Sequence, residues 1–343
     1  VDGRKRQMEL LGDLYWSSPG FDLNDMGYMK ETDYLMNETE IMYRQTDIWK
    51  IFRYNAFTLS QKNMWNYGGT PFSNNASLRW QSMTMNRYEW DVKETFAWNW
   101  LDSRLLRGGP DVRFGSYFLT SAKFNTDKAK RMMFMLKYEG DHNFEGNRFN
   151  TISPSLTFRL GNHVYLSGQL DYAWNTDEMQ YVATTSPLSS SSLTPYYYVM
   201  GHMDQKTYGL TLKLQVNVTP DISIQFYGAP FTSIAKYDDF KLAADTKSHT
   251  FENRFQRIDP DHLTYADGVY TIGEGAGQMP FRNPDFRFNE FRSNLVARWE
   301  YLPGSTLYFV WEHRMSNRGQ LVFLRAGEVI WIVCGDSPLQ IRS

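Results

Sequence analysis

The sequence predicts an all-β protein, and within that class an up-and-down antiparallel transmembrane β-barrel of about fourteen strands. Such a barrel has long external loops on one side and short periplasmic turns on the other. Three observations support this prediction. Apolar and polar residues alternate in many segments, short and long connections take turns along the chain, and aromatic residues stand at the ends of many apolar faces.

The alternation is clearest in residues 208–218, which read YGLTLKLQVNV. Because successive side chains of a strand point to opposite faces, this segment has an apolar face and a polar face. In a barrel the apolar face meets lipid, while Lys213, Gln215 and Asn217 face the lumen. The same alternation occurs in residues 90–100, 163–174, 222–226, 295–301 and 307–311. Helical periodicity does not extend over a useful length, so an all-β chain is expected.

The connections between these segments alternate in length. The short ones consist of residues that suit tight turns, namely Thr46-Asp47, Asn86-Arg87, Asn125-Thr126-Asp127, Gly161-Asn162, Thr219-Pro220-Asp221 and Pro303-Gly304. Long ones are expected at residues 17–36, 62–74, 102–110, 140–148, 175–205 and 236–285. A soluble sandwich does not require a regular alternation of short and long connections. An outer-membrane barrel has this alternation because its turns are short on the periplasmic side and its loops are long outside.

Strand length and aromatic residues favour the same fold. The expected strands have about ten to thirteen residues, which suits a tilted strand that crosses a hydrocarbon layer, whereas globular strands usually have about five or six. The aromatic residues at the ends of the apolar faces resemble the interfacial girdles of outer-membrane barrels. They are Trp16, Trp80, Trp90, Trp98, Trp100, Trp174, Trp299 and Tyr301. A half-buried soluble sheet also shows alternation of apolar and polar residues. The barrel is therefore favoured by the strand length, the aromatic girdles and the alternation of short and long connections.

The composition excludes several classes of protein. The 343 residues carry a formal net charge of -2 with a pI of about 6.4, so no surface for nucleic acid is expected. A single cysteine, Cys334, excludes an intrachain disulfide and a cysteine metal cluster. No apolar run is long enough for a membrane helix. The opening VDGRKRQMEL is no signal peptide, so we expect a processed chain or a fragment whose Sec signal lies upstream.

Two stretches resemble a known family. They are SPGFDLNDMGYM at residues 18–29 and NPDFRFNEFRSNLVARWEYLPGSTLYFVWEHR at residues 283–314. Both are similar to the C-terminal region of an uncharacterised Bacteroidota family. Its members carry an N-terminal carbohydrate-binding-like domain of the family-nine type, and the region that follows resembles an outer-membrane barrel. The resemblance spans residues 14–314 and implies no catalytic residues. The hydrolase label that members often carry comes from automatic transfer.

The chain is therefore divided into two parts. Residues 1–318 are expected to form the outer-membrane β-barrel, and residues 319–343 an atypical C-terminal tail. A barrel usually ends on an aromatic residue, but the last residue here is Ser343. We expect the tail to be either a closing strand at residues 321–333 or a non-native end.

Charged residues that alternate with the apolar faces are candidates for the lumen, where such residues tune solute passage or pair with one another. The candidates are Arg53, Arg79, Lys93, Arg159, Lys213, Arg298 and Glu300. Aromatic residues of the loops are candidates for stacking on sugars, although packing or a girdle is their more common role. The candidates for glycan contact are Trp65, Tyr67, Tyr196 and Tyr197.

Several carboxylates lie close together on the longest expected loop. Hard oxygen ligands suit Ca²⁺, which makes Asp259, Asp261 and Asp267 the candidate ligands. Their spacing does not match an EF-hand, so a solvated acidic loop without a metal is the expectation. No cofactor is expected.

Three functions remain open. The first is an outer-membrane barrel that anchors or translocates, linked to a glycan or polymer or to solute passage. Its partners would be outer-membrane lipid, the barrel-assembly machinery and a glycan or polymer, without nucleic acid, and its location the bacterial outer membrane. The second is an outer-membrane hydrolase of an ester, lipid or glycan with a Ser/His site at the rim. The third is a soluble carbohydrate-binding β domain.

A serine motif in the tail does not provide evidence for the hydrolase function. Gly335-Asp336-Ser337 resembles the opening motif of a lipase family. A serine nucleophile needs a base within hydrogen-bond reach, and no such partner follows this serine in the sequence. The catalytic residues stay unassigned, and we do not expect the chain to be an enzyme by itself.

Overall fold

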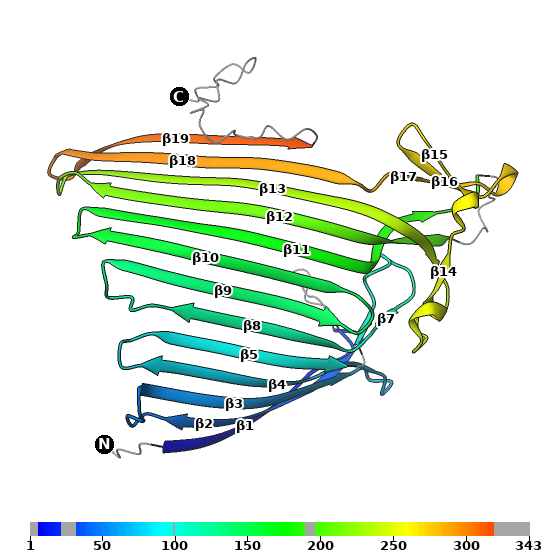
Figure 1. The fold of residues 1–343 in the computed structure, drawn as a ribbon, viewed down its shortest axis with the longest axis horizontal. Helices are drawn as coiled ribbons and strands as arrows, with labels where there is room; N and C mark the ends of the chain where they lie inside the picture. The colour runs from blue at the N-terminus through cyan, green and yellow to red at the C-terminus, as the bar shows by residue number, and fades with distance from the viewer. Residues whose placement is uncertain (1–5, 22–31, 99, 189–195, 319–343) are drawn as a thin grey trace.

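Figure 1 shows the computed structural model of the chain, which describes residues 6–21, 32–98, 100–188 and 196–318. These residues form a fourteen-stranded antiparallel sheet, a three-stranded sheet and a two-stranded sheet. Helical structure within them is limited to three single-turn 3-10 helices. The predicted all-β class and antiparallel order are therefore confirmed.

In the described part of the chain, no helix has the length and apolar character needed to span a membrane.

The elements have the following bounds. The large sheet contains β1 (Arg6–Ser17), β2 (Tyr34–Gln45), β3 (Phe52–Trp65), β4 (Pro71–Thr84), β5 (Glu89–Trp98), β8 (Tyr117–Asn125), β9 (Met132–Asn143), β10 (Arg148–Leu160), β11 (Val164–Thr185), β12 (Tyr197–Asn217), β13 (Ile222–Ala243), β14 (Phe255–Arg257), β18 (Phe286–Leu302) and β19 (Ser305–Arg318). The two-stranded sheet contains β6 (Trp100–Asp102) and β7 (Val112–Phe114), and the three-stranded sheet contains β15 (Leu263–Ala266), β16 (Val269–Ile272) and β17 (Met279–Arg282). The helices are η1 (Phe251–Arg254), η2 (Pro260–His262) and η3 (Gly275–Gly277).

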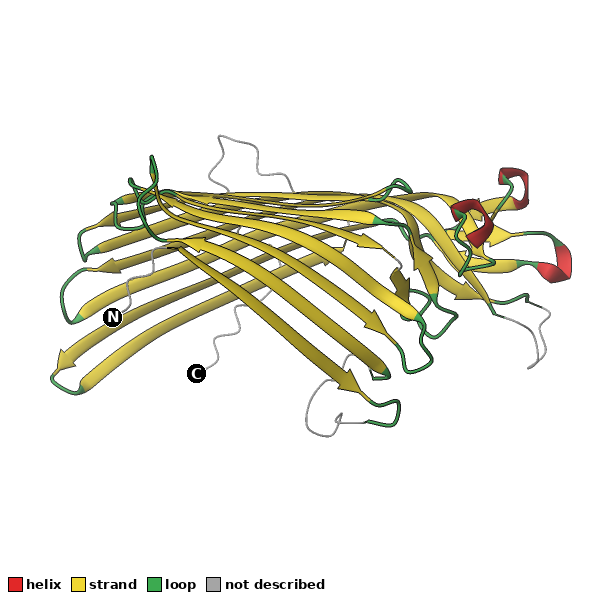
Figure 2. Cartoon of the chain, turned by 90° about the horizontal axis from the view of Figure 1, so that it is seen from below, coloured by secondary structure: helices red, strands yellow, loops and turns green. Residues whose placement is uncertain are grey.

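The large sheet is a meander in which each strand pairs with the next one along the chain. Thirteen strands follow a single path from β1 to β19, and β14 pairs with the end of β13. Among the described strands β1 and β19 have one neighbour each, so the sheet is open between them. The sheet is twisted and curved along its length (Figure 2), as antiparallel sheets of this size are.

All six predicted tight turns lie at the same end of the sheet, which we call the turn end (left in Figure 1). The connections there have at most six residues. The connections at the opposite end, which we call the loop end, include the 42 residues between β13 and β18. The predicted alternation of short and long connections is therefore present.

Several predicted long loops are shorter than expected. The connection from β3 to β4 has only residues 66–70, and the one from β9 to β10 only residues 144–147. Most of the predicted loop at residues 175–205 is strand, because β11, β12 and β13 have 22, 21 and 22 residues. Polar cross-strand contacts, such as the 2.8 Å bond from Thr176 Oγ1 to Asp204 Oδ1, continue the ladder beyond the apolar segments. The expected strand length was therefore wrong for these three strands, and β18, with 17 residues, is also longer than expected.

Buried apolar side chains gather at the loop end. They form two clusters, where the outer parts of β11–β13 pack against the small sheets and β14. One cluster contains Leu106, Val112, Met179, Met200 and Phe255, and the other Val199, Phe240, Leu242, Ile272 and Phe281. The main apolar core of the described residues is thus a layer at one end of the sheet.

The two faces of the large sheet differ in polarity, as the alternation predicts. Cross-strand partners share a face, and one row of partners with only apolar side chains crosses the strands from β10 to β19. The row consists of Phe158, Leu166, Leu214, Phe226, Leu295 and Trp311. We call this the apolar face and the opposite one the polar face. Lys213 lies on the polar face, where its partners are Ser167 and Tyr227.

Candidate functional site

The polar face carries a network of side-chain contacts between neighbouring strands. Arg79 donates from Nε and Nη2 to the two carboxylate oxygens of Asp91, at 2.8 and 2.5 Å. Hydroxyl groups pair as well, for example Ser60 with Ser77 at 2.6 Å. These polar groups therefore satisfy one another within the sheet.

The candidate lumen residues fall mainly on this polar face. Arg79 and Lys93 are direct cross-strand partners, and Arg298 binds Glu300 at 2.5 Å. Arg159 lies opposite Tyr165, with its guanidinium 5.9 Å from the centre of that ring. Arg53 differs, because it lies at a register shift at the turn end of β3. The sequence periodicity thus assigned the face of most candidates, but it did not predict their ion pairs.

A groove lies on the polar face where β11, β12, β13 and β18 run side by side. It has a volume of about 340 Å³ and is lined by Tyr165, Lys213, Gln215, Gln225 and Tyr227, among others. Of the candidate lumen residues, Lys213 belongs to this groove. The combination of an ammonium group, amides and aromatic rings suits polar solutes.

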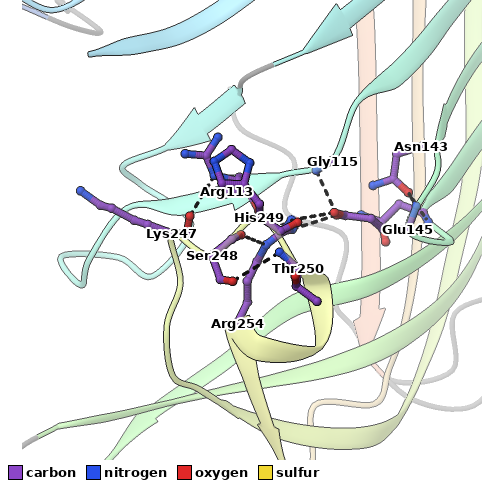
Figure 3. A network of polar contacts seen from close by, with 10 residues as sticks. Arg113, Gly115, Asn143, Glu145, Lys247, Ser248, His249, Thr250 and Arg254 are labelled. Atoms are coloured by element: carbon purple, nitrogen blue, oxygen red, sulfur yellow. Dashed lines mark hydrogen bonds and ion pairs between the residues drawn. The ribbon is translucent and has the colours of Figure 1, made fainter. Parts of the chain in front are cut away.

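At the loop end, Arg254 of η1 holds several distant segments together (Figure 3). Its guanidinium binds Glu145 through Nη1 at 2.9 Å and Nη2 at 2.7 Å. It also donates to the backbone oxygens of Arg113, Ser248 and His249. We call Arg254, Glu145 and these contacts the loop-end clasp. The clasp joins the β13–β18 connection to β7 and to the β9–β10 turn.

The β9–β10 turn is fixed by further bonds around the clasp. The backbone N–H groups of Glu145 and Asn147 donate to Asn143 Oδ1, at 2.9 and 2.8 Å. Glu145 Oε2 accepts from the Gly115 N–H at 2.9 Å, and a Cβ on Gly115 would lie 2.5 Å from Glu145 Cδ. Asn147 Oδ1 in turn accepts from the Glu178 N–H at 2.6 Å. The turn is therefore connected to β11 as well as to the clasp.

A pocket lies next to this turn at the loop end of the polar face. Its volume is about 260 Å³. It lies between the β6–β7 hairpin, the starts of β8 and β10, the end of β9 and the outer part of β11. We call it the loop-end pocket, and its lining residues are Asp102, Phe114, Tyr117, Asp141, Asn143, Asn147, Arg148, Phe149, Asn175, Thr176 and Asp177.

Burial and neighbouring charges shift the pKa values of two ionisable groups on the outer parts of β11 and β12. Burial raises the pKa of Asp177, and the Glu178 carboxylate adds to the rise. Burial alone would lower the pKa of His202, but Glu178, Asp238 and Asp204 raise it above its ordinary value. His202 Nδ1 lies 3.0 Å from Glu178 Oε1, which makes that carboxylate its nearest charged partner.

The aromatic candidates for glycan contact belong to two separate connections. Trp65 ends β3, and the Tyr67 N–H donates to Asp33 Oδ1 at 2.9 Å. Tyr196 is exposed, while Tyr197 begins β12 and packs against the second apolar cluster. None of the four lines the loop-end pocket.

The candidate calcium ligands have local structural roles. Asp259 caps η2, where its Oδ1 accepts from the Asp261 N–H at 3.0 Å. Asp267 has a φ of 51° and forms the turn between β15 and β16 with Gly268. Among the described residues, no group of three or more His, Cys, Asp or Glu side chains is placed to hold a metal ion.

Neither the clasp nor the loop-end pocket was predicted from the sequence. Arg254 and Glu145 are 109 positions apart, so no local pattern links them. Asp141 and Asp177 lie in segments that were predicted to be loops, although both belong to strands. After Trp174 the sequence continues with four polar residues, Asn175 to Glu178, so the period of two gave no signal that β11 extends further.

Comparisons with known proteins identify a family. Searches of the curated proteins and of the solved structures found no match to the chain. A protein-family model matches residues 6–325, which covers every described strand. The chain therefore belongs to the family described as Domain of unknown function (DUF5916).

Proposed function

We propose that the chain is the β-barrel of a bacterial outer-membrane protein, which anchors a surface component or passes a polar solute or polymer along its polar face. We infer further that the family is the Bacteroidota family that the two sequence motifs resemble. The observation that carries the proposal is the exposure of the apolar face. Leu78 is 57% exposed, Leu166 47% and Trp299 50%. A soluble protein seldom exposes an apolar surface that continues across many strands.

The ends of the apolar face have the composition of membrane interfaces. On β11 and β12, Tyr172 stacks on Trp174 and Tyr208, with ring centres 5.2 and 4.9 Å apart. Beyond these rings the same face becomes polar, with Glu178 and His202. At the turn end Trp299 and Tyr301 form a second aromatic pair. Aromatic rings favour the headgroup level of a bilayer, so the two groups fit the two interfaces.

The length of the apolar segment fits a bilayer. From Val164 to Trp174, β11 advances ten residues, which is ~33 Å at about 3.3 Å per residue. A tilt of about 40° reduces this to ~25 Å, the height of the apolar band in outer-membrane barrels. The outer parts of β11–β13 then extend beyond the membrane on the loop side.

One acidic residue interrupts the apolar face. Glu94 of β5 lies between Leu78 and Thr120 in the register. Its carboxylate accepts a hydrogen bond of 2.7 Å from Thr120 Oγ1. A hydrogen-bond partner lowers the cost of a polar group in an apolar environment. The apolar faces of β10–β13, in the segments between the aromatic groups, carry no charged residue.

Closure of the barrel requires one more strand. Thirteen strands in antiparallel succession leave β1 and β19 running in the same direction. An even-stranded antiparallel barrel therefore needs a strand between them that runs from the loop end to the turn end. The predicted closing strand, at residues 321–333, lies outside the described residues and stays a prediction.

The test is to express the chain with a Sec signal, fractionate the cells, and run the membrane fraction on a gel with and without boiling. Extraction by detergent alone, together with a mobility shift on heating, is the expected result. A soluble chain without a shift would overturn the proposal and favour the soluble carbohydrate-binding domain. Turnover of generic ester or glycan substrates that a single Ser or His substitution abolishes would instead establish the hydrolase.

A further inference from the structure

We propose that the loop-end pocket binds an uncharged, hydroxyl-rich ring, such as one sugar unit of a glycan. The inference rests on the proposed function only for the side from which the ligand arrives, the outer mouth of the barrel. The pocket itself is defined by Asp141, Asn143, Asn147, Phe149 and Asp177 together with their neighbours. None of these residues is among the candidates that the sequence suggested for glycan contact.

The pocket offers acceptors that the protein does not use. Asp141 forms no side-chain hydrogen bond or ion pair with the described residues, so both its carboxylate oxygens are available. Asp177 uses Oδ1 for the Met179 N–H at 2.9 Å, and Asp102 uses Oδ1 for the N–H groups of Arg104 and Leu105. The second oxygen of each of these two carboxylates remains available to accept from a ligand.

The pocket also offers donors whose orientation is fixed. Asn143 Oδ1 accepts from two backbone N–H groups of the β9–β10 turn, and Asn147 Oδ1 accepts from Glu178. These bonds assign the oxygen of each amide, because a backbone N–H needs an acceptor. The Nδ2 groups of both amides form no hydrogen bond with the described residues. They are therefore available as donors.

This combination of donors and acceptors selects the class of ligand. A hydroxyl group both donates and accepts, so a ring with several hydroxyls can use carboxylates and amide donors at once. Three carboxylates line the pocket, those of Asp102, Asp141 and Asp177, against the single guanidinium of Arg148, so an anion would meet net repulsion. A metal cation would need several carboxylates gathered around one point, and the described residues contain no such group.

Apolar surface and size agree with a single ring. Phe114, Tyr117 and Phe149 bring aromatic rings to the lining, and the C–H face of a sugar ring is apolar enough to pack on them. The volume of about 260 Å³ is near the lower end for ligand pockets, which begins at about 300 Å³. The pocket therefore suits one ring of a longer chain that continues outside.

The test is calorimetric titration of the detergent-solubilised full chain with cellobiose, maltose and chitobiose, and with galacturonic acid and Ca²⁺ for comparison. We expect at least one neutral disaccharide to bind, and the acid and the cation to bind more weakly. Asp141→Asn and Phe149→Ala should each lower the affinity, the first by about tenfold or more, since a hydrogen bond to a charged group contributes roughly that factor.

Asp221→Asn is the matched control, because Asp221 is an aspartate in the β12–β13 turn at the opposite end of the sheet. It should bind as the unaltered chain does. If no neutral disaccharide binds, or if both pocket variants bind as the control does, the inference is wrong. Membrane extraction and heat shift are scored on the same samples. A membrane-bound chain without sugar binding overturns the pocket alone, and a soluble chain that binds sugar overturns the barrel alone.

Discussion

Arg254 and Glu145 form a two-point ion pair across 109 positions of the chain, with N–O distances of 2.7 and 2.9 Å. The Arg254 side chain is 1% exposed and that of Glu145 13%. The other hydrogen bonds that the guanidinium donates within the described residues go to backbone oxygens. The position of the long β13–β18 connection over the β9–β10 turn therefore depends on one buried cation.

Substitution of Arg254 should loosen the loop end. Arg254→Ala leaves the Glu145 carboxylate buried without its partner, and loss of one member of a buried ion pair costs about 3–5 kcal/mol. Hydrogen exchange of residues 244–257 and 143–148 should become faster, while exchange at the turn end stays unchanged. Hydrogen exchange followed by mass spectrometry measures both regions in one experiment.

Lys247→Ala is the control for this substitution. Lys247 binds Asp111 at 2.7 Å at the same end of the sheet, but the two side chains are 58% and 38% exposed. An exposed pair contributes about 0–1 kcal/mol, so little change is expected. Equal effects of the two variants would show that Arg254 does not hold the loops.

The extension of β11 and β12 should become less stable as pH rises. The pKa of His202 is raised in the fold, so its protonated form is favoured there. The stability that protonated His202 contributes is fully present below the ordinary histidine pKa of about 6.5. It is lost as pH rises through the raised pKa. Hydrogen exchange of residues 176–183 and 199–206 between pH 6 and pH 9 measures this loss.

His202→Gln should remove this part of the pH dependence, because the variant has no ring to titrate beside Glu178 and Asp204. Asp177 also has a raised pKa. Because a raised pKa favours the protonated form in the fold, this carboxyl also contributes less stability as pH rises, so only the part of the pH dependence that His202→Gln removes belongs to the histidine. An unchanged profile in the variant would assign the pH dependence to other groups.

The features that the sequence predicted correctly are local ones. Each tight turn is defined by two or three adjacent residues, such as Gly161, which has a φ of 61° and directly follows β10. The two faces follow from the period of two along each strand, so Lys213 was placed on the polar face. Both signals are contained within a dozen residues and need no knowledge of the fold.

The features that the sequence did not predict depend on distant contacts. The outer part of β12 contains Gly201, His202 and Asp204, which have no strong preference for a strand. It is held by pairing with β11 and by packing of Met200 in the loop-end layer. The clasp and the loop-end pocket are likewise built from separate connections, so no single segment carries their pattern.

Removal of the C-terminal segment tests how the proposed barrel closes. Without residues 319–343, the strands β1 and β19 run in the same direction at the two edges of the sheet. Unpaired backbone groups in lipid cost several kcal/mol each, so we expect the truncated chain to lose its heat-dependent mobility shift. Removal of residues 336–343 alone leaves the predicted closing strand and should retain the shift. A shift in both variants would indicate that β1 pairs directly with β19.

The two faces of β11 should differ in their tolerance of charge. Leu170 lies on the apolar face opposite Leu210, near the middle of the apolar segment, and its neighbour Gln169 lies on the polar face opposite Thr211. A charged arginine at the bilayer midplane of a barrel costs about 2–4 kcal/mol. Leu170→Arg should therefore lower the free energy of unfolding by roughly that amount. Urea unfolding of the chain in lipid vesicles, followed by tryptophan fluorescence, measures the change.

Gln169→Arg places the same side chain one position away on the other face. Gln169 Nε2 donates to Asp171 Oδ1 at 2.9 Å, and an arginine keeps a donor for that carboxylate. We expect its unfolding free energy to stay within about 1 kcal/mol of the unaltered chain, as for ordinary surface substitutions. The difference between two adjacent positions isolates the environment of each face, because charge, size and strand are the same. Equal effects would mean that the apolar face does not contact lipid.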